Sequence, residues 1–246
     1  MEILISEKIN RKTQALNFFK ALIRDLSKGL AVKINDVNEK NGFINLVVEG
    51  EDLEAFISFL KKTFGLAPSR IDDIKLNPIF KAFISRIENG IQLDTGIMHP
   101  KLVKVYIPIE TLWTQLAYGK RERIETITTQ YCLFKDFPLE VRAVRLKEDE
   151  VEAMLSDKQL QLFWEWQTLP FERVIIGDVL INEVKKAINL TNAKKEIIEI
   201  KSLSLFTHSL TCKLGLSSKL IAFKLQKQLP ASRILSFTPK NFKVDC

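Results

Sequence analysis

The residue types that most often do chemistry are sparse in this sequence. It contains two histidines, His99 and His208, and three cysteines, Cys132, Cys212 and Cys246. His208 and Cys212 are four residues apart, so on a strand they would share one face, as a thiol–imidazole pair requires. A buried free cysteine is by far the commoner role for such a residue. Neither histidine has the spacing from a cysteine that a zinc site needs.

Two acidic patterns could also carry chemistry. The Asp-Thr-Gly of residues 94–96 has the residue types of an aspartic protease turn, but those enzymes need two aspartates that share a proton, and the pattern occurs once. The Glu-Asp-Glu of residues 148–150 lies at an expected helix start, where carboxylates favour the helix dipole. The sequence lacks a GxxxxGK[ST] loop and a GxGxxG fingerprint. These observations predict a protein that is not an enzyme, with no catalytic residues, metal or cofactor.

Basic residues are the stronger signal. The formal net charge is +7, and it is uneven along the chain. Residues 81–147 carry 11 basic and 7 acidic side chains, and residues 194–246 carry 10 and 3. Such segments are typical of proteins that bind a polyanion, although a merely solvated surface has the same composition.

Aromatic residues are interleaved with these basic residues, as in platforms for single-stranded nucleic acid, where charge follows the phosphates and rings stack on bases. Strand alternation predicts that Phe83 is buried and that Tyr106 lies on the outer face. The candidate RNA-binding residues are Lys81, Arg86, Lys104, Tyr106, Lys120, Arg121, Arg123, Arg142, Arg145, Lys213, Lys219, Lys224 and Lys227.

Three units are expected to position these residues. Residues 1–70 read as strand, helix, strand, strand, helix, with a hairpin at Asn41-Gly42. Residues 71–147 read as five strands with a short helix after the third, which is the order of an OB-type barrel. Its strands are expected at 79–89, 90–97, 102–110, 129–137 and 139–146.

The third unit, residues 148–246, is expected to begin with an amphipathic helix in 147–170, with Ser156 and Asp157 as an internal N-cap pair. A second βαββα order follows, with a last strand at 233–239. In this helix Trp164 and Trp166 point to different sides, so one is expected in the core and the other outside. The fold class is therefore α+β, with two α/β sandwich-like domains that flank a central five-stranded OB-type β-barrel.

The segments GIQLDTGI, VKVYIPIETL, QLFWEWQ, 173–215 and SSKLIAFKLQKQLP resemble an uncharacterised archaeal family, domain of unknown function twenty-one-ten. The family's middle segment is similar to a ribosomal RNA-binding OB domain. The resemblance implies a cytoplasmic archaeal protein with an RNA or ribonucleoprotein partner. In this sequence Ile91 occupies a position where that domain carries a stacking ring, and Pro108 one where a histidine often contacts RNA. The barrel's first hairpin, residues 81–97 joined around Asn89-Gly90, is therefore expected to build the barrel and not to read a base.

The leading hypothesis is a cytoplasmic, ribosome- or ribonucleoprotein-associated protein that contacts RNA phosphates through the barrel and the C-terminal unit. The alternative is a protein-interaction scaffold or regulator of the translation or transcription machinery, without direct RNA binding. No apolar run reaches the length of a membrane span and the first residues do not read as a secretory signal, so no membrane partner is expected.

Overall fold

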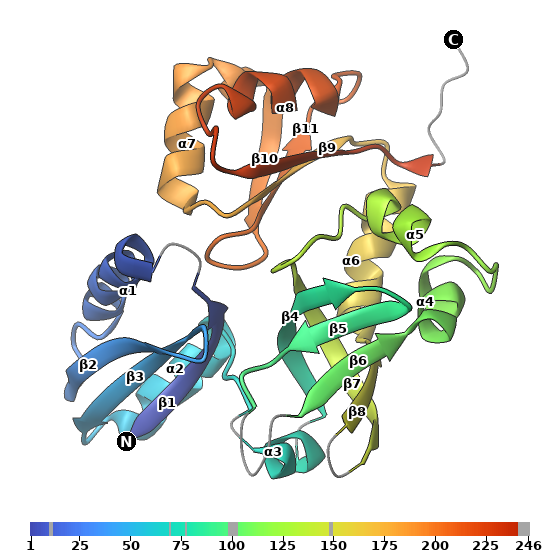
Figure 1. Cartoon of the computed structure of the whole chain (residues 1–246). Helices are drawn as coiled ribbons and strands as arrows, with labels where there is room; N and C mark the ends of the chain where they lie inside the picture. Colours follow the sequence, from blue (N-terminus) through green and yellow to red (C-terminus); the bar gives the residue numbers. More distant parts are fainter. Residues whose placement is uncertain (10–11, 69, 77, 98–102, 148–149, 241–246) are drawn as a thin grey trace.

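The computed structural model describes residues 1–9, 12–68, 70–76, 78–97, 103–147 and 150–240. Three units follow one another along the chain (Figure 1). An N-terminal unit and a C-terminal unit each combine helices with an antiparallel sheet, and a closed five-stranded barrel connects them in the sequence. The protein is thus of mixed α+β type with a central barrel.

The N-terminal unit places two helices on one face of a three-stranded sheet. Its elements are β1 (Glu2–Lys8), α1 (Lys12–Leu26), β2 (Val32–Lys40), β3 (Phe43–Gly50) and α2 (Leu53–Thr63). The strand order is β1-β3-β2. Phe19 and Ile23 of α1 and Phe56 and Leu60 of α2 form its buried core with the inner face of the sheet. These positions recur at helical spacing, so each helix buries one apolar stripe.

The hairpin between β2 and β3 forms at the expected Asn41-Gly42. Both residues have left-handed backbone conformations, with φ of 58° and 82°. Such a turn matches the twist of the two strands and suits Asn-Gly. The short helix α3 (Ile71–Leu76) then leads into the barrel.

The barrel closes in the order β4-β5-β6-β8-β7. Its elements are β4 (Ile79–Ile87), β5 (Gly90–Asp94), β6 (Lys104–Pro108), α4 (Ile109–Leu116), α5 (Ile124–Gln130), β7 (Pro138–Leu146) and β8 (Glu150–Leu155). β6 and β8 pair in parallel, and the other neighbours are antiparallel. Phe83 and Ile91 are buried, as expected for residues that build the barrel and its packing faces.

The expected strand at 129–137 is wrong. The segment begins in α5 and then turns through Cys132 and Asp136, which have φ of 53° and 69°. Left-handed residues interrupt a strand, so the apolar side chains between them are buried without joining a sheet. Leu133 and Phe134 belong to the core in this irregular conformation.

The first part of the expected helix in 147–170 is also wrong, because residues 150–155 form β8, the fifth barrel strand. Val151, Ala153 and Leu155 are buried at alternating positions, whereas the helical interpretation rested on Val151, Met154 and Leu155. Over six residues an apolar pattern can fit both the helical period and the strand period. The pairing of this segment with its neighbours in the closed barrel makes it a strand. The N-cap is confirmed, since the Ser156 hydroxyl accepts a hydrogen bond from the Gln159 backbone N–H at 3.1 Å.

The C-terminal unit begins with α6 (Asp157–Thr168), which packs against the barrel. It continues with β9 (Arg173–Gly177), α7 (Ile181–Leu190), a 3-10 turn at Ala193–Glu196, β10 (Ile197–Ser202), β11 (His208–Cys212), α8 (Ser218–Gln226) and β12 (Arg233–Phe237). The sheet order is β10-β11-β9-β12. Trp166 is buried and contacts Phe163 and Phe237, whereas Trp164 is exposed, so the expected division of the two tryptophans is confirmed.

The end of β1 joins all three units. The buried carboxylate of Glu7 accepts a hydrogen bond from the Lys81 ammonium of the barrel at 2.5 Å and from the Leu205 backbone N–H of the C-terminal unit at 2.9 Å. Next to it, Lys8 pairs with Asp94 at 2.9 Å and with Asp136 at 2.8 Å. The units are therefore fixed to one another by charged groups that lie largely out of water.

Burial has opposite effects on these two groups. It raises the pKa of Glu7 above the usual carboxyl range, and the opposing attraction of Lys81 does not cancel this effect. For Lys8, burial acts to lower the pKa, but its contacts with the Asp136 and Asp94 carboxylates outweigh burial and raise it. Lys8 therefore keeps its charge where the N-terminal unit meets the barrel.

Candidate nucleic-acid interface

Three arginines of the barrel surface are already paired with carboxylates. Arg86 lies 2.7 Å from Glu88. Arg142 lies 3.1 Å from Asp157, and Arg145 lies 3.8 Å from Glu152. These pairs are largely exposed, so each contributes little to stability, but each also offsets local positive potential. These three candidate RNA-binding arginines are therefore less available to bind phosphates than the sequence suggests.

Lys81 has a structural role in this fold. Its ammonium pairs with Glu7 and lies 5.6 Å from the ring centre of Phe83. Lys104 is exposed and forms no ion pair with another described residue, and Tyr106 is half-buried beside it on β6. Their partners in the neighbouring strand β8 are Glu150 and Glu152. The outer face of β6 is therefore not a basic surface.

The loop between α4 and α5 carries three basic residues and one acidic residue, Glu122. We call residues 118–123 the α4–α5 loop. Trp113 holds it in one conformation: its indole N–H donates to the Glu122 carbonyl at 2.6 Å, and its backbone carbonyl accepts from the Gly119 N–H at 2.8 Å. The Arg121 guanidinium lies 5.9 Å from the Trp113 ring centre. A loop fixed in this way loses little conformational entropy when it binds a ligand.

Three basic side chains project from the α4–α5 loop: Lys120, Arg121 and Arg123. All are exposed, and none has an ion-pair partner among the residues that the structure describes. Tyr118 is 88% exposed, with a left-handed backbone at φ 53°. A bulky residue in that conformation carries a backbone cost, which suggests a functional constraint. The loop combines phosphate-binding charge with an accessible ring.

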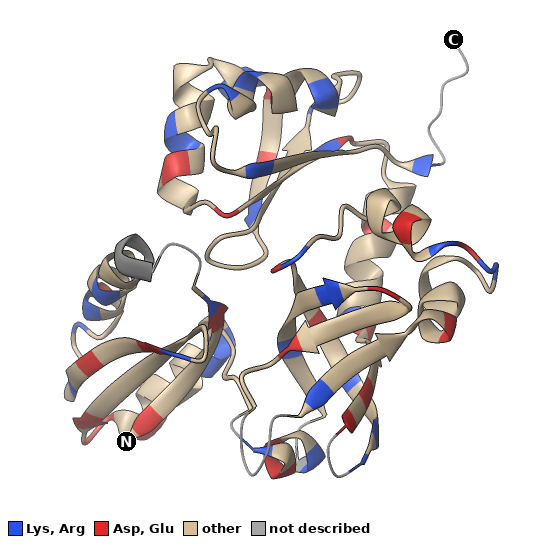
Figure 2. Cartoon of the chain, viewed as in Figure 1, with Lys and Arg blue, Asp and Glu red and all other residues tan. Residues whose placement is uncertain are grey.

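The basic residues of the C-terminal unit lie around an exposed apolar surface. We define the α8 surface as Leu214, Leu216, Leu220 and Phe223 together with Lys213, Lys219 and Lys227; each of the four apolar side chains is more than a third exposed. The Lys227 ammonium lies 4.7 Å from the Phe223 ring centre. Lys224 instead pairs with Glu196. Figure 2 shows the basic residues of α8 and of the α4–α5 loop on separate units.

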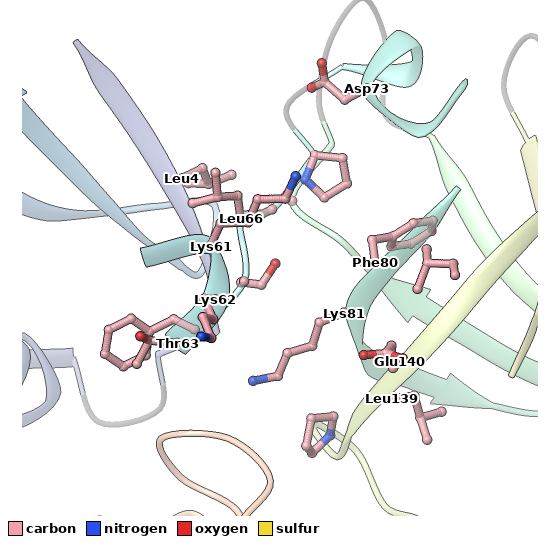
Figure 3. A pocket seen from close by; sticks show the side chains of 18 of the residues that line it. Leu4, Lys61, Lys62, Thr63, Leu66, Asp73, Phe80, Lys81, Leu139 and Glu140 are labelled. Carbon is pink, nitrogen blue, oxygen red and sulfur yellow. The ribbon is translucent and has the colours of Figure 1, made fainter. Parts of the chain in front are cut away.

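A large cleft lies where the three units meet, with a volume of about 1160 Å³. We call it the interunit cleft. Lys61, Lys62 and Thr63 of α2 form one side, and Phe80, Lys81, Leu139 and Glu140 of the barrel form the other (Figure 3). Residues of α6 and of the β10 end also contribute, including Gln159 and Lys201.

Neither described cysteine resembles an activated nucleophile. Burial raises the pKa of Cys132 to about 12 and that of Cys212 to about 11, so both remain thiols near neutral pH. Burial lowers the pKa of His208 to about 4. Its Nδ1 lies 3.0 Å from the Ser202 hydroxyl and its Nε2 lies 3.0 Å from the Val179 carbonyl. His99 and Cys246 lie outside the described residues.

Two further findings concern the described part of the chain. His, Cys, Asp and Glu side chains there form no cluster of three or more that could hold a metal ion. Among the same residues, no helix combines the length and the apolar character needed to cross a bilayer.

The fold and these surfaces define a mixed α+β protein that has a closed five-stranded barrel at its centre. Residues 81–167, from β4 almost to the end of α6, match the DUF2110 central domain, which belongs to an uncharacterised family. No curated protein matches the chain. Among solved structures, the intact alpha subunit of aIF2 from Pyrococcus abyssi aligns over 66% of this chain and 96% of that one, at 9% identity and a TM-score of 0.23. A TM-score this low supports no conclusion about fold or function.

Sequence reasoning missed several residues of these surfaces. Tyr118 could have been noticed, because an aromatic residue before Gly119 and a basic run is a recognisable pattern. Lys61 and Lys62 match the charge preference of a helix C-terminus, so nothing local marks them as a cleft wall. The role of Glu7 depends on contacts 74 and 198 residues away in the sequence, which no local pattern reports.

Proposed function

We propose that this protein is a non-enzymatic RNA-binding protein that contacts phosphate groups mainly through the α4–α5 loop. The observation that carries the proposal is the hydrogen-bonded loop with an 88% exposed Tyr118 and three basic side chains that form no ion pair with a described residue. The basic side chains attract phosphates, and the ring offers a stacking face for a base. Lys213 and Lys219 of the C-terminal unit would add further charge.

The barrel topology supports an OB-type assignment. Its order β4-β5-β6-β8-β7, with helices between the third and fourth strands in the sequence, is the arrangement of that class. OB-type barrels commonly bind single strands. The family resemblance adds a ribonucleoprotein partner and a cytoplasmic, archaeal setting to the proposal. The described surfaces show no array of side chains placed to hydrogen-bond to the edges of bases. Binding should therefore depend on the phosphate backbone of the RNA more than on the RNA sequence.

Fluorescence anisotropy with a labelled single-stranded RNA of about twelve nucleotides tests the proposal. Affinity should fall roughly ten-fold or more between about 50 and about 200 mM salt. The triple variant Lys120→Gln/Arg121→Gln/Arg123→Gln should lower the slope of log affinity against log salt by about 2, since each lost phosphate contact removes about 0.7. A matched control, Lys185→Gln/Lys186→Gln/Lys194→Gln, removes as many exposed charges elsewhere and should leave the slope largely unchanged.

Tyr118→Asn separates stacking from charge. Asparagine tolerates the left-handed backbone of this position, so the loop should keep its shape. Affinity should fall roughly five-fold or more, because a stacked base contributes about 1–3 kcal/mol, while the salt slope stays the same. Absence of RNA binding by the wild-type protein at about 50 mM salt would overturn the proposal.

The α8 surface favours a second function, the binding of a protein partner. Four large apolar side chains exposed within ten residues are unusual for a free surface. Lys213, Lys219 and Lys227 surround them, so the complementary partner is a segment that alternates acidic and apolar residues. This function corresponds to an interaction scaffold that needs no direct RNA contact.

A photo-crosslinking residue at Leu220 tests this second function in nuclease-treated extract. The cross-linked partner peptide should be rich in acidic and apolar residues, and Phe223→Asp should abolish the product. Leu190 at the end of α7 is comparably exposed and is the control position. Products of equal yield from Leu190, or products that contain only nucleic acid, would contradict a protein partner at α8.

A further inference from the structure

The interunit cleft has an excess of positive side chains. Its lining contains seven basic and four acidic residues. Lys40 and Lys158 pair with Glu2 and Glu140, and Lys81 pairs with Glu7. The remaining cations are Lys61, Lys62, Arg70 and Lys201. Each of these four is exposed and lacks an ion-pair partner among the described residues.

The remaining carboxylates do not remove this excess. Glu165 accepts a hydrogen bond from the Gln161 side chain at 3.2 Å. Asp73 accepts one from the Arg70 backbone N–H at 2.8 Å, which leaves the Arg70 guanidinium available. The four available cations come from three parts of the fold: α2, the segment before α3, and β10.

Two buried polar groups in the same lining lack hydrogen-bond partners. The Ser6 hydroxyl and the Gln159 side-chain amide nitrogen are both buried and unsatisfied, although the Gln159 oxygen accepts from the Glu140 backbone N–H at 3.0 Å. Unsatisfied buried donors are uncommon because each one costs free energy. Both atoms are shielded from solvent, so a ligand in the cleft would reach them only after a local shift of the lining.

The cleft has room for a segment of a polymer. A volume of about 1160 Å³ exceeds the roughly 300–1,000 Å³ of pockets for small molecules. Leu4, Leu66 and Leu162 also line the cleft and offer apolar contact. Single-stranded RNA presents charged phosphates and flat, largely apolar bases, which match the basic and apolar side chains of this lining.

We infer that the interunit cleft holds a segment of single-stranded RNA, with Lys61, Lys62, Arg70 and Lys201 as its phosphate contacts. This inference rests on the proposed function and assigns it a second site. The walls are pre-formed, because Glu7 and Lys8 tie the N-terminal unit to both others. The RNA therefore binds across the junction and adds to the contacts of the α4–α5 loop.

The test compares Lys61→Gln/Lys62→Gln with the control Lys185→Gln/Lys186→Gln in the RNA anisotropy assay. Both variants remove two adjacent exposed lysines from one helix. The cleft variant should lower the salt slope by about 1.4, while the control leaves it near the wild-type value. With RNA that carries 4-thiouridine, cross-linked peptides from residues 61–70 and 201–203 should appear and should weaken in the cleft variant.

The outcomes separate the two proposals. If wild-type protein binds RNA and the cleft variant behaves as its control does, the cleft inference is wrong and RNA binding through the loop stands. If wild-type protein does not bind RNA at about 50 mM salt, the proposed function fails and the cleft inference fails with it. Competition by a mononucleotide as effective as that by the RNA strand would also overturn the inference, since it would indicate a small-molecule site.

Discussion

His208 is buried between two hydrogen-bond partners that define its neutral tautomer. The Val179 carbonyl can only accept, so Nε2 carries the proton and Nδ1 accepts from the Ser202 hydroxyl. Protonation would place a second proton on Nδ1 and a charge in an apolar interior. Burial thus lowers the pKa to about 4.

This pKa predicts a loss of stability in acid. Because the unfolded histidine binds its proton near pH 6.5 and the folded one only near pH 4, the free energy of unfolding should fall as the pH drops through that interval. The loss amounts to about 3 kcal/mol for this group. Urea denaturation of wild type and of His208→Gln between about pH 7 and pH 4 measures the difference.

In the His208→Gln variant this component should be absent, so the difference in stability between the two proteins should change with pH. A constant difference over the interval would show that His208 does not titrate as its burial predicts. All other groups, including those outside the described residues, are the same in both proteins and cancel in the comparison.

At the residue scale, local periodicity predicted some positions correctly. Phe83 is buried, as strand alternation predicts, and of the two tryptophans one is in the core and one is exposed, as helical spacing predicts. Which basic side chains lack an ion-pair partner could not be predicted in the same way. Lys81 and Arg142 appear free in the sequence, yet their partners come from other elements, and the sequence does not show which elements meet.

Among the elements, the β4–β5 hairpin depends on Gly90. Its φ is +148°, and a Cβ built there would lie 2.5 Å from the Ile107 carbonyl of β6. The neighbouring strand therefore passes directly over the glycine, and no side chain fits without a shift of the backbone. The hairpin expected from Asn89-Gly90 needs this glycine for barrel closure as well as for the turn.

Gly90→Ala should destabilise the protein by roughly 2–4 kcal/mol, since it adds overpacking against backbone to an unfavourable φ. Gly29→Ala is the matched control, because Gly29 also has a positive φ but open space around its Cβ position; it should cost about 1–2 kcal/mol. Thermal unfolding followed by circular dichroism measures both. Equal losses would show that the Ile107 contact is relieved at no cost.

Prediction of elements succeeded where the pattern was long and failed where it was short. The five elements of residues 1–70 and the last strand at 233–237 follow from periodicity and turns. The strand expected at 129–137 and the helix expected before Ser156 failed because apolar runs of six to nine residues fit more than one period. The barrel's fifth strand is identified by sheet closure, which is a property of the tertiary fold.

For the whole molecule, the Glu7–Lys81 pair should be an important link between units. Lys81→Met leaves the buried Glu7 carboxylate without its cation and should cost roughly 3–5 kcal/mol at neutral pH. Urea denaturation gives this value. Lys104→Met, which removes an exposed lysine of the same barrel, should cost much less than this.

The loss of stability caused by Lys81→Met should become smaller in acid. Burial raises the pKa of Glu7, so its protonated form is favoured in the folded protein, and protonation removes the unpaired buried charge. Stability of the variant relative to wild type should therefore increase as the pH falls below the folded pKa of Glu7 towards the unfolded value. A deficit that stays constant with pH would contradict this account of the junction.

The partners of Glu7 also constrain the order in which the protein can be completed during synthesis. The N-terminal sheet is available early, yet Leu205, the N–H donor to Glu7, is 198 residues further along the chain. The Glu7–Leu205 hydrogen bond can form only after Leu205 has left the ribosome, whereas the pair of Glu7 with Lys81 can form much earlier. The contact between the first and the last unit therefore closes a loop of nearly the whole chain.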